Sequence, residues 1–329
     1  NVLNISKDFG LKISYGFWIP SEINFINDSI ETQRLKRQIL DEVEKNKDKA
    51  NITSWAIQND IQYNQKDHFN KPELLYQNSA FIIWLKDLIT EIKKIDPGKP
   101  VIVDLEVNPQ SIYFAKVLKS NIPEIDALGI IVKNSEYLET LTEYLTQSNI
   151  NFVYSDIPVN EIIEHKIIAK NKALFASAYQ DQFESDKLSF YGITDRKGRF
   201  KTDYYNLKNV LENPNAPVRS LKTKILKPAT LIYEGQKHWY LAMYYDEKEG
   251  WKEADEVEGL TFEWSVIRCD ASGNYVSIKD MGNAPYIHLK IPKSYDYYRL
   301  LLTTIKDGEV SISITTLNTP LEPKSENFN

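Results

Sequence analysis

The stretch LKDLITEIKKIDPGKPVIVDL, residues 85–105, decides the fold. Leu85, Leu88 and Ile92 recur at the spacing of one helix face, with charged residues between them. The tripeptide Asp96-Pro97-Gly98 then ends the helix, because proline and glycine interrupt regular backbone. The apolar run that follows has the length of a buried strand. The stretch therefore predicts a helix followed by a strand, the repeating unit of a parallel α/β sheet.

The same alternation extends in both directions, from residue 10 to residue 212. Strands are predicted at 11–18, 52–58, 101–105, 125–132, 152–154 and 173–179, and helices at 30–47, 72–94, 111–118, 135–145 and 204–211. Ser135 is the predicted N-cap of its helix. A closed (β/α)8 TIM-type barrel needs eight strands, two more than these six. The α/β part is therefore either such a barrel with its N-terminal strands missing or an open doubly wound sheet.

The pattern changes after Leu211. The prolines of residues 213–217 predict a linker, which divides the chain into a barrel at 1–212 and a second domain at 218–329. Turn signals at 270–273 and 306–308 separate short alternating strands in the second domain. These strands are predicted at 230–233, 238–244, 260–267, 286–291, 297–303 and 310–316. The second domain is predicted to be an all-β sandwich of immunoglobulin-like size, without the Cys…Trp…Cys pattern.

Composition excludes several classes of function. The 329 residues are 42% hydrophobic and 26% charged, which is typical of a globular chain and not of a disordered or collagen-like one. The net charge of −6 argues against a nucleic-acid partner. No apolar run approaches the ~18 residues of a membrane-spanning helix. The single cysteine, Cys269, excludes an internal disulfide framework, and the four histidines do not come at ligand spacing. We therefore expect neither a metal nor an organic cofactor.

Polar and aromatic residues follow the predicted strands, where parallel barrels collect their active sites. Carboxylates, amides and aromatic rings dominate, and there is no Ser/His pair and no glycine-rich phosphate loop. Planar polar groups suit sugar hydroxyls, and aromatic rings suit the apolar faces of sugar rings. The candidate sugar-contacting residues are Trp18, Asn59, Asp60, Asp104, Glu106, Asn134, Asp156, Tyr179, Gln180 and Asp181.

Some of these candidates also have simpler interpretations. Asp104 and Glu106 are either a second carboxylate pair or part of a solvated loop. Trp18, at a strand end, is the better candidate for stacking on a sugar, whereas Trp55, inside its strand, is predicted to pack in the barrel. In the second domain, the aromatic residues of 239–251 form either a glycan-binding strip or the ordinary core of a spacer domain.

Four segments resemble clan A glycoside hydrolases of families two and five. KRQILDEVEKNKDKANITSWAIQND at 36–60 is similar to their fourth-strand region, which ends in W-x-x-G-N-E. LKDLITEIKKIDPGKPV at 85–101 is similar to the next helix and strand entry. FVYSD at 152–156 lies where those enzymes end the seventh strand in S-E, and YGITDRKGRFKTDYYNL at 191–207 resembles their closing segment. The resemblance spans about 200 residues, in the family's order and spacing.

The resemblance implies a TIM barrel whose acid/base is Asp60 and whose nucleophile is Asp156, each in place of the family's Glu. Gln58 replaces the motif glycine, and Tyr179 stands near the family's tryptophan platform. Three consequences are open: a site that only holds a glycan, an inverting enzyme with a water between the two carboxylates, or a backbone shift that restores the retaining distance.

Three functions follow from these alternatives. The first is a glycoside hydrolase that acts on an oligo- or polysaccharide, and the retained carboxylates favour it. The second is a non-catalytic glycan-binding pseudoenzyme domain of a larger cell-envelope or polysaccharide-synthesis protein, favoured by the double Glu-to-Asp change. The third is a structural adaptor. A carbohydrate partner favours an extracytoplasmic location.

Overall fold

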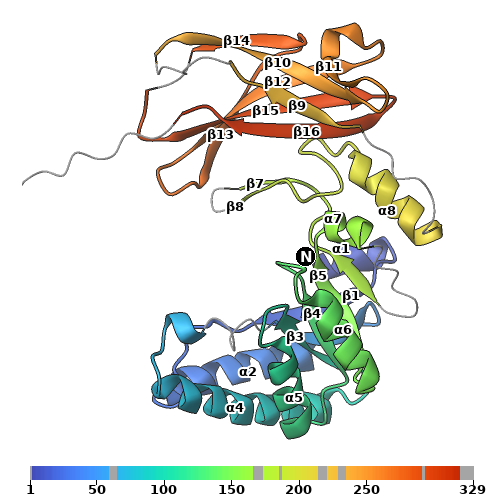
Figure 1. The fold of residues 1–329 in the computed structure, drawn as a ribbon. Coiled ribbons are helices and arrows are strands. Elements are labelled where there is room, and N and C mark those ends of the chain that lie inside the picture. The colour runs from blue at the N-terminus through green and yellow to red at the C-terminus, as the bar shows by residue number, and fades with distance from the viewer. Residues whose placement is uncertain are drawn as a thin grey trace, which may run out of the picture. The chain divides into compact units, whose positions relative to one another are not determined.

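A computed structural model describes residues 2–58, 65–165, 173–184, 187–213, 221–228, 235–290 and 293–318. The chain divides into two compact units. The first contains residues 1–158 and 169–176, and the second contains residues 159–168 and 177–329. Figure 1 colours the chain from the N-terminus to the C-terminus and labels the elements of both units. The predicted linker at 213–217 lies almost wholly outside the described residues, so the predicted domain boundaries stay a prediction.

The first unit contains a six-stranded parallel sheet with the strands in chain order, β1-β2-β3-β4-β5-β6. This order excludes the open doubly wound alternative, because a doubly wound sheet reverses its strand order at a switch point. The sheet is a parallel half-barrel. Its strands are β1 Ile13–Trp18, β2 Ile52–Gln58, β3 Val101–Glu106, β4 Ala127–Ile131, β5 Phe152–Ile157 and β6 Leu174–Ala176. The unit's helices are α1 Val2–Asp8, α2 Ser29–Asn46, α4 Glu73–Ile95, α5 Ser111–Asn121 and α6 Leu138–Gln147, with a 3-10 turn at Gln65–Asp67.

Helices α2, α4 and α5 lie along one side of this sheet (Figure 1). The predicted apolar face of α4 is confirmed, because Leu85, Leu88 and Ile92 are fully buried. Trp55 of β2 is also fully buried, as predicted, and its indole nitrogen donates a hydrogen bond to the Asp96 carboxylate at the end of α4 (3.1 Å). Trp55 therefore marks the face of the sheet that is turned toward the helices.

The other face of the sheet carries small and polar side chains. The Ser54 hydroxyl donates to the Ser14 hydroxyl across β1 and β2 (2.7 Å). Side chains alternate along a strand, so Ser54 and Ala56 point away from the helices. In β3, Val101 and Val103 are fully buried and pair with Trp55 and Ile57, so their side chains lie on the face turned toward the helices. By alternation, the side chains of Asp104 and Glu106 lie on the polar face.

One helix start was predicted wrongly. Helix α6 begins at Leu138 with Tyr137 as its N-cap, and Ser135 is not a cap. Instead, the Ser135 carbonyl accepts the Leu138 amide (3.0 Å) in a turn that precedes the helix. A serine two residues before the actual N-cap satisfies the same sequence pattern as a true N-cap, and only the backbone geometry distinguishes the two.

The second unit contains two four-stranded antiparallel sheets, one formed by β9, β10, β11 and β14 and the other by β12, β13, β15 and β16. Buried residues from both sheets, among them Tyr240, Trp264 and Leu300, form one hydrophobic cluster, so the sheets share a core. The strands are β9 Thr223–Leu226, β10 Lys237–Asp246, β11 Gly250–Glu253, β12 Thr261–Cys269, β13 Tyr275–Gly282, β14 Tyr286–Lys290, β15 Tyr297–Lys306 and β16 Glu309–Thr316. The unit also contains α7 Val159–Glu164, α8 Thr202–Glu212, a 3-10 turn at Ala254–Glu256, and a small hairpin of β7 Gln182–Glu184 and β8 Lys187–Ser189.

The predicted turn at 306–308 is confirmed. Asp307 and Gly308 both have positive φ (52° and 81°), as the two central residues of a type I′ hairpin turn require. The strand predicted at 230–233 lies outside the described residues. Sequence patterning missed the short strands β7, β8, β9 and β11, and it missed β13, which lies at the edge of its sheet. Most of β13 is exposed, so it lacks the apolar alternation that identifies a strand.

Within the described part of the chain, the helices are too short or too polar to cross a membrane.

Candidate functional site

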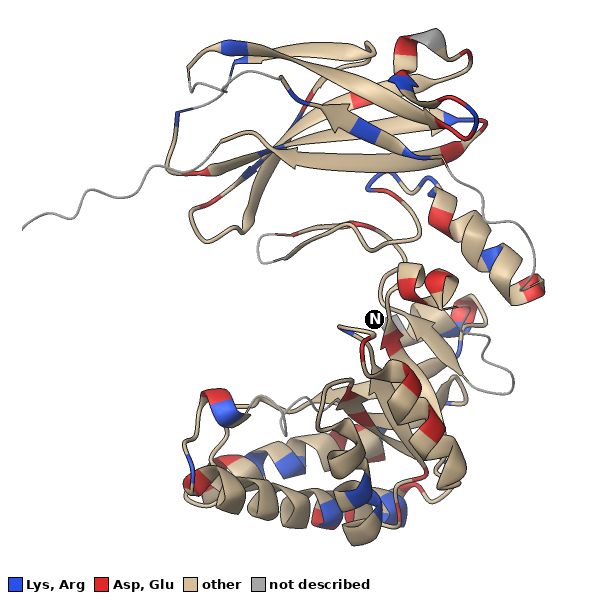
Figure 2. Cartoon of the chain, viewed as in Figure 1, with Lys and Arg blue, Asp and Glu red and all other residues tan. Residues whose placement is uncertain are grey.

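The six strands of the half-barrel carry three charged side chains, all of them carboxylates, and no Lys or Arg. They are Asp104 and Glu106 of β3 and Asp156 of β5. Figure 2 shows acidic segments in red on the strands of this unit, whereas its basic segments, in blue, lie on the surrounding helices and loops. An acidic sheet face without cationic residues is an unusual arrangement that packing does not require, and it is therefore our candidate site.

A glycine makes room for the buried carboxylate. Asp104 pairs with Gly129 of β4 and is 2% exposed. A Cβ atom added to Gly129 would lie 1.9 Å from Asp104 Oδ1 and 2.1 Å from the Ser155 hydroxyl oxygen. The Asp104 carboxyl and the Ser155 hydroxyl therefore meet over the bare backbone of Gly129.

A bulge in β5 brings Ser155 and Asp156 to this face. Tyr154 pairs with Ile130 and Asp156 pairs with Ile131, so Ser155 is an extra residue in β5. A bulge re-aims side chains that strict alternation would send to opposite faces. Since Ile131 also pairs with Glu106, the side chains of Glu106 and Asp156 lie in one row across β3, β4 and β5.

Burial raises the pKa of the Asp104 carboxyl from its ordinary value of 3.8 to about 6, and the nearby negative charge of Asp156 adds to this shift. The Ser155 hydroxyl is close enough to oppose the shift. It does not complete a hydrogen bond to Oδ1, which has no partner among the described residues. Asp104 thus changes its charge near neutral pH, which is common for carboxyl groups at functional sites.

The buried position of Asp104 corrects one interpretation of the sequence, because Asp104 and Glu106 belong to strand β3 and not to a solvated loop. Glu106 is mostly buried, and its carboxylate accepts from the Lys133 ammonium (2.7 Å). The next residue, Asn134, is exposed, and its side-chain oxygen accepts the Glu136 amide (2.9 Å) in the loop after β4. In β3, the Glu106 carboxylate is therefore charge-paired with Lys133, whereas the buried Asp104 carboxyl has no ion-pair partner among the described residues.

Trp18 ends β1 on the same face. It pairs with Gln58, and its side chain is 57% exposed. By contrast, Phe17 stacks on the buried Trp55, and Tyr15 packs against it edge to face. Trp18 is therefore available to stack on a ligand at the edge that also carries Asp156. The other two predicted residues at this edge, Asn59 and Asp60, lie outside the described residues.

The remaining predicted site residues belong to the second unit. Tyr179 is 66% exposed. The Gln180 amide donates to the Asp195 and Arg196 carbonyls (3.2 and 3.1 Å). Asp181 is buried and accepts from the Lys201 ammonium and the Gly192 amide (both 3.0 Å). These contacts occupy the Gln180 amide and one carboxylate oxygen of Asp181, whereas Asp181 Oδ2 is buried with no hydrogen-bond partner among the described residues.

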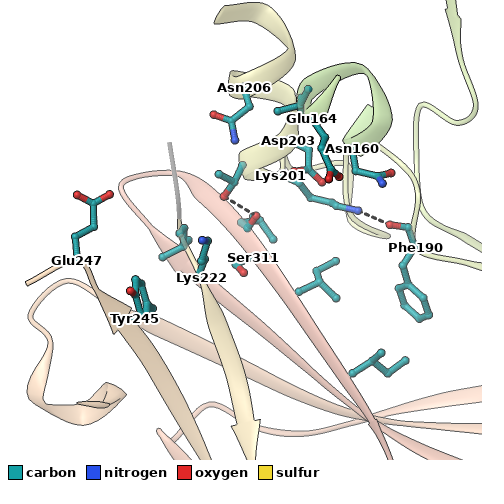
Figure 3. A pocket seen from close by; sticks show the side chains of 16 residues that line it. Asn160, Glu164, Phe190, Lys201, Asp203, Asn206, Lys222, Tyr245, Glu247 and Ser311 are labelled. Atoms are coloured by element: carbon teal, nitrogen blue, oxygen red, sulfur yellow. Dashed lines mark hydrogen bonds between the residues drawn. The ribbon is translucent and has the colours of Figure 1, made fainter. Parts of the chain in front are cut away.

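A cavity of about 750 Å³ opens in the second unit, and none of the residues that the sequence singled out as a site lines it. Figure 3 shows Asn160, Glu164 and Asp203 near Lys201 on its helical side, with Lys222 and Tyr245 on the side of the sheet. The sequence offers no motif for this cavity, because its lining comes from α7, α8, the strands β10 and β16 and the connections between such elements, which are far apart in the chain. Within the described residues, no three of the His, Cys, Asp and Glu side chains gather as a metal site.

No family model matches the chain, and no curated protein matches it either. Among solved structures, the chain is similar to a β-glucuronidase of Bacteroides uniformis, with a TM-score of 0.50 and 12% sequence identity over 97% of this chain and 40% of that one. The same values relate it to B. uniformis β-glucuronidase 2 covalently bound to cyclophellitol-6-carboxylate aziridine. A calcium-binding mutant of the latter gives a TM-score of 0.51 at 11% identity. The chain thus spans 40% of the length of these enzymes, and its fold is similar to the fold of the part that it matches.

Proposed function

We propose that this chain is a glycoside hydrolase-like protein that acts on an oligo- or polysaccharide at the carboxyl-terminal edge of its half-barrel. The observation that carries the proposal is the row of carboxylates on strands that hold no cationic residue, with Asp156 exposed at its end. The glycosidase-like fold supports it. In this proposal the half-barrel is part of a TIM-type barrel, and a β-sandwich follows it.

The proposed chemistry uses Asp60 and Asp156. Asp60 donates a proton to the glycosidic oxygen as the bond to the anomeric carbon breaks. In the inverting form, Asp156 takes a proton from a water whose oxygen attacks that carbon from the opposite face. Inverting enzymes hold the two carboxyl groups roughly 6.5–9.5 Å apart, against about 5–5.5 Å in retaining ones. Aspartate is one methylene shorter than glutamate, so two aspartates favour the wider separation.

The neighbouring side chains suit this chemistry. Trp18 offers an exposed ring for a sugar face, and the Glu106–Lys133 pair offers both an acceptor and a donor for hydroxyls. Asp104 lies beneath the edge, close enough to Asp156 that the negative charge of Asp156 disfavours ionisation of Asp104. A proton held by Asp104 therefore reduces the negative charge beneath the reacting carboxylate.

The second candidate function is glycan binding without hydrolysis. The observation that favours it is the aspartate at both positions where the family has glutamate. If the two shorter side chains leave the carboxyl groups too far apart for either to react with a sugar, the residues still form a polar site of the size of a sugar. The same residues would then contact the glycan without a reacting water.

Replacing Asp156 with Asn tests both candidates. We expect the release of new reducing ends from an oligosaccharide panel to fall at least tenfold, because a positioned acid or base contributes roughly 10²-fold or more to a rate. Glu124→Gln is the matched control, since Glu124 is an exposed carboxylate that precedes β4 at the opposite edge of the sheet.

Three outcomes separate the candidates. Turnover that Asp156→Asn abolishes and Glu124→Gln preserves supports hydrolysis. Glycan binding without turnover, weakened by Asp156→Asn, supports the non-catalytic function. A wild-type protein that neither binds nor cleaves any glycan in the panel contradicts both.

A further inference from the structure

The sheet of β9, β10, β11 and β14 has an outer face that the shared core does not use. Tyr240, Ala242, Ile287 and Leu289 are buried and belong to that core. Side chains alternate along a strand, so the residues between them point outward. Along β10 these are Trp239, Leu241, Met243 and Tyr245, and along β14 they are Tyr286, His288 and Lys290.

One end of this outer face is a flat aromatic platform. Trp239 pairs with His288 across the two strands, and their rings stack at 4.4 Å with planes 5° apart. Tyr286 packs its edge against Trp239 at 5.4 Å. Trp239 is 51% exposed and Tyr286 is 50% exposed. Large aromatic rings left half exposed in a contiguous group mark an interaction site more often than isolated exposed residues do.

The other end is also aromatic. Tyr245 packs against Trp251 of β11 at 5.3 Å, and the Lys224 ammonium lies 4.0 Å from the Trp251 ring centre. Tyr245 and Lys222 also line the cavity of Figure 3, so the outer face continues to the rim of that cavity. From Trp239 to Tyr245 the strand advances six residues, or about 20 Å at ~3.3 Å per residue. The face is therefore long enough for a chain of several sugar units.

The charge on this face is predominantly positive. Lys237 lies directly opposite Lys290, both are exposed, and neither forms an ion pair among the described residues. Like charges directly opposite each other in a sheet are destabilising. Lys222 and Lys224 add two ammonium groups at the other end, where carboxylates are present at Glu253 of β11 and at Glu247 on the cavity rim. An anionic ligand would relieve this repulsion.

We propose that this outer face is a second carbohydrate site, which binds an anionic polysaccharide along β10. Sugar rings stack on the Trp239–His288–Tyr286 platform, and their acidic groups pair with Lys237 and Lys290. This site lies in the second unit and does not depend on the proposed function of the half-barrel. Nucleic-acid bases also stack on aromatic rings, but the net charge of −6 disfavours a polyphosphate partner.

The test compares binding of polygalacturonate, a polymer of carboxylated sugars, with binding of neutral dextran of similar length, by titration calorimetry on the full chain. We expect polygalacturonate to bind and dextran to bind weakly. Trp239→Ala and Tyr286→Ala should each weaken polygalacturonate binding about tenfold, and Lys237→Gln with Lys290→Gln should weaken it as much. Tyr191→Ala is the matched control, because Tyr191 is 63% exposed but lies on neither sheet.

Glu124→Gln, an exposed change in the half-barrel, should leave polygalacturonate binding unchanged. Unchanged binding in both Trp239→Ala and Tyr286→Ala overturns the proposal. Equal binding of dextran overturns the charge argument and with it the proposal. Tighter binding of oligouridylate than of polygalacturonate overturns it in favour of a nucleic acid.

Discussion

Replacing Gly129 with Ala is expected to destabilise the half-barrel by at least about 3 kcal/mol, the upper part of the range for overpacking a core. The new Cβ would lie 1.9 Å from Asp104 Oδ1 and 2.1 Å from the Ser155 hydroxyl oxygen. Neither neighbour can move aside easily. Asp104 is 2% exposed and stands in the middle of β3, and Ser155 is held by the bulge in β5. The strain therefore passes to three adjacent strands.

Urea unfolding monitored by hydrogen exchange in the β3, β4 and β5 peptides measures this effect, because it reports on the half-barrel and not on the second unit. Gly98→Ala is the matched control. Its Cβ would have one neighbour, Asp96 Oδ1, at the ordinary contact distance of 3.7 Å, and we expect a change within about 0.5 kcal/mol. If Gly129→Ala behaves like Gly98→Ala, the close meeting of Asp104 and Ser155 is wrong.

A combined variant tests the cause of the effect. Asp104→Ala and Ser155→Gly together remove both atoms that the new Cβ would meet. In that background Gly129→Ala should cost much less than in the wild type, because the residues are in direct contact and their effects are not additive. An equal cost in both backgrounds would place the strain in the backbone of β4 instead.

Local periodicity was sufficient for most elements of the first unit. The strand at 52–58 has the predicted bounds, and the helix predicted at 30–47 is found at Ser29–Asn46. The predictions succeed there because one buried face per element leaves a regular apolar pattern. The same reasoning failed for β13, which is an edge strand with little burial and therefore with little pattern.

The candidate site was less accessible to sequence reasoning. A strand-end position suggested Asp156 and Trp18, but the burial of Asp104 depends on Gly129, which is 25 positions further along the chain and becomes its neighbour only through the register of β3 and β4. The extra residue in β5 is likewise invisible in the sequence, because a bulge is defined by the partner strand. Asp60, the second predicted catalytic carboxylate, stays a prediction.

The pH dependence of stability should reveal the buried Asp104 directly. The folded state raises its pKa from 3.8 to about 6, so the folded chain holds this proton more tightly than the unfolded chain does. The contribution of Asp104 to the free energy of unfolding is therefore highest below pH 4, falls as the pH rises from about 4 to about 6, and is constant above that. A shift of roughly two units corresponds to about 3 kcal/mol.

Other carboxylates act in the opposite direction, so the informative quantity is the difference between the wild type and Asp104→Asn. Salt-bridged groups such as Asp96 have a lowered pKa, so their contribution to the free energy of unfolding is lost as the pH falls. An amide at position 104 carries no charge at any of these pH values. The free energy of unfolding of Asp104→Asn, relative to that of the wild type, should therefore rise by about 3 kcal/mol between pH 4 and pH 7. Altered hydrogen bonding at position 104 adds a constant to this difference and does not change its dependence on pH.

Urea unfolding of both proteins at half-unit pH intervals, followed in the β3 peptides, measures this difference. A difference that stays flat from pH 4 to pH 7 would contradict the raised pKa of Asp104. Asp156→Asn provides an independent check, because the charge of Asp156 is one cause of the shift. Its removal should lower the pKa of Asp104 and move the whole transition to lower pH. A transition that keeps its midpoint in Asp156→Asn would show instead that burial alone raises the pKa of Asp104.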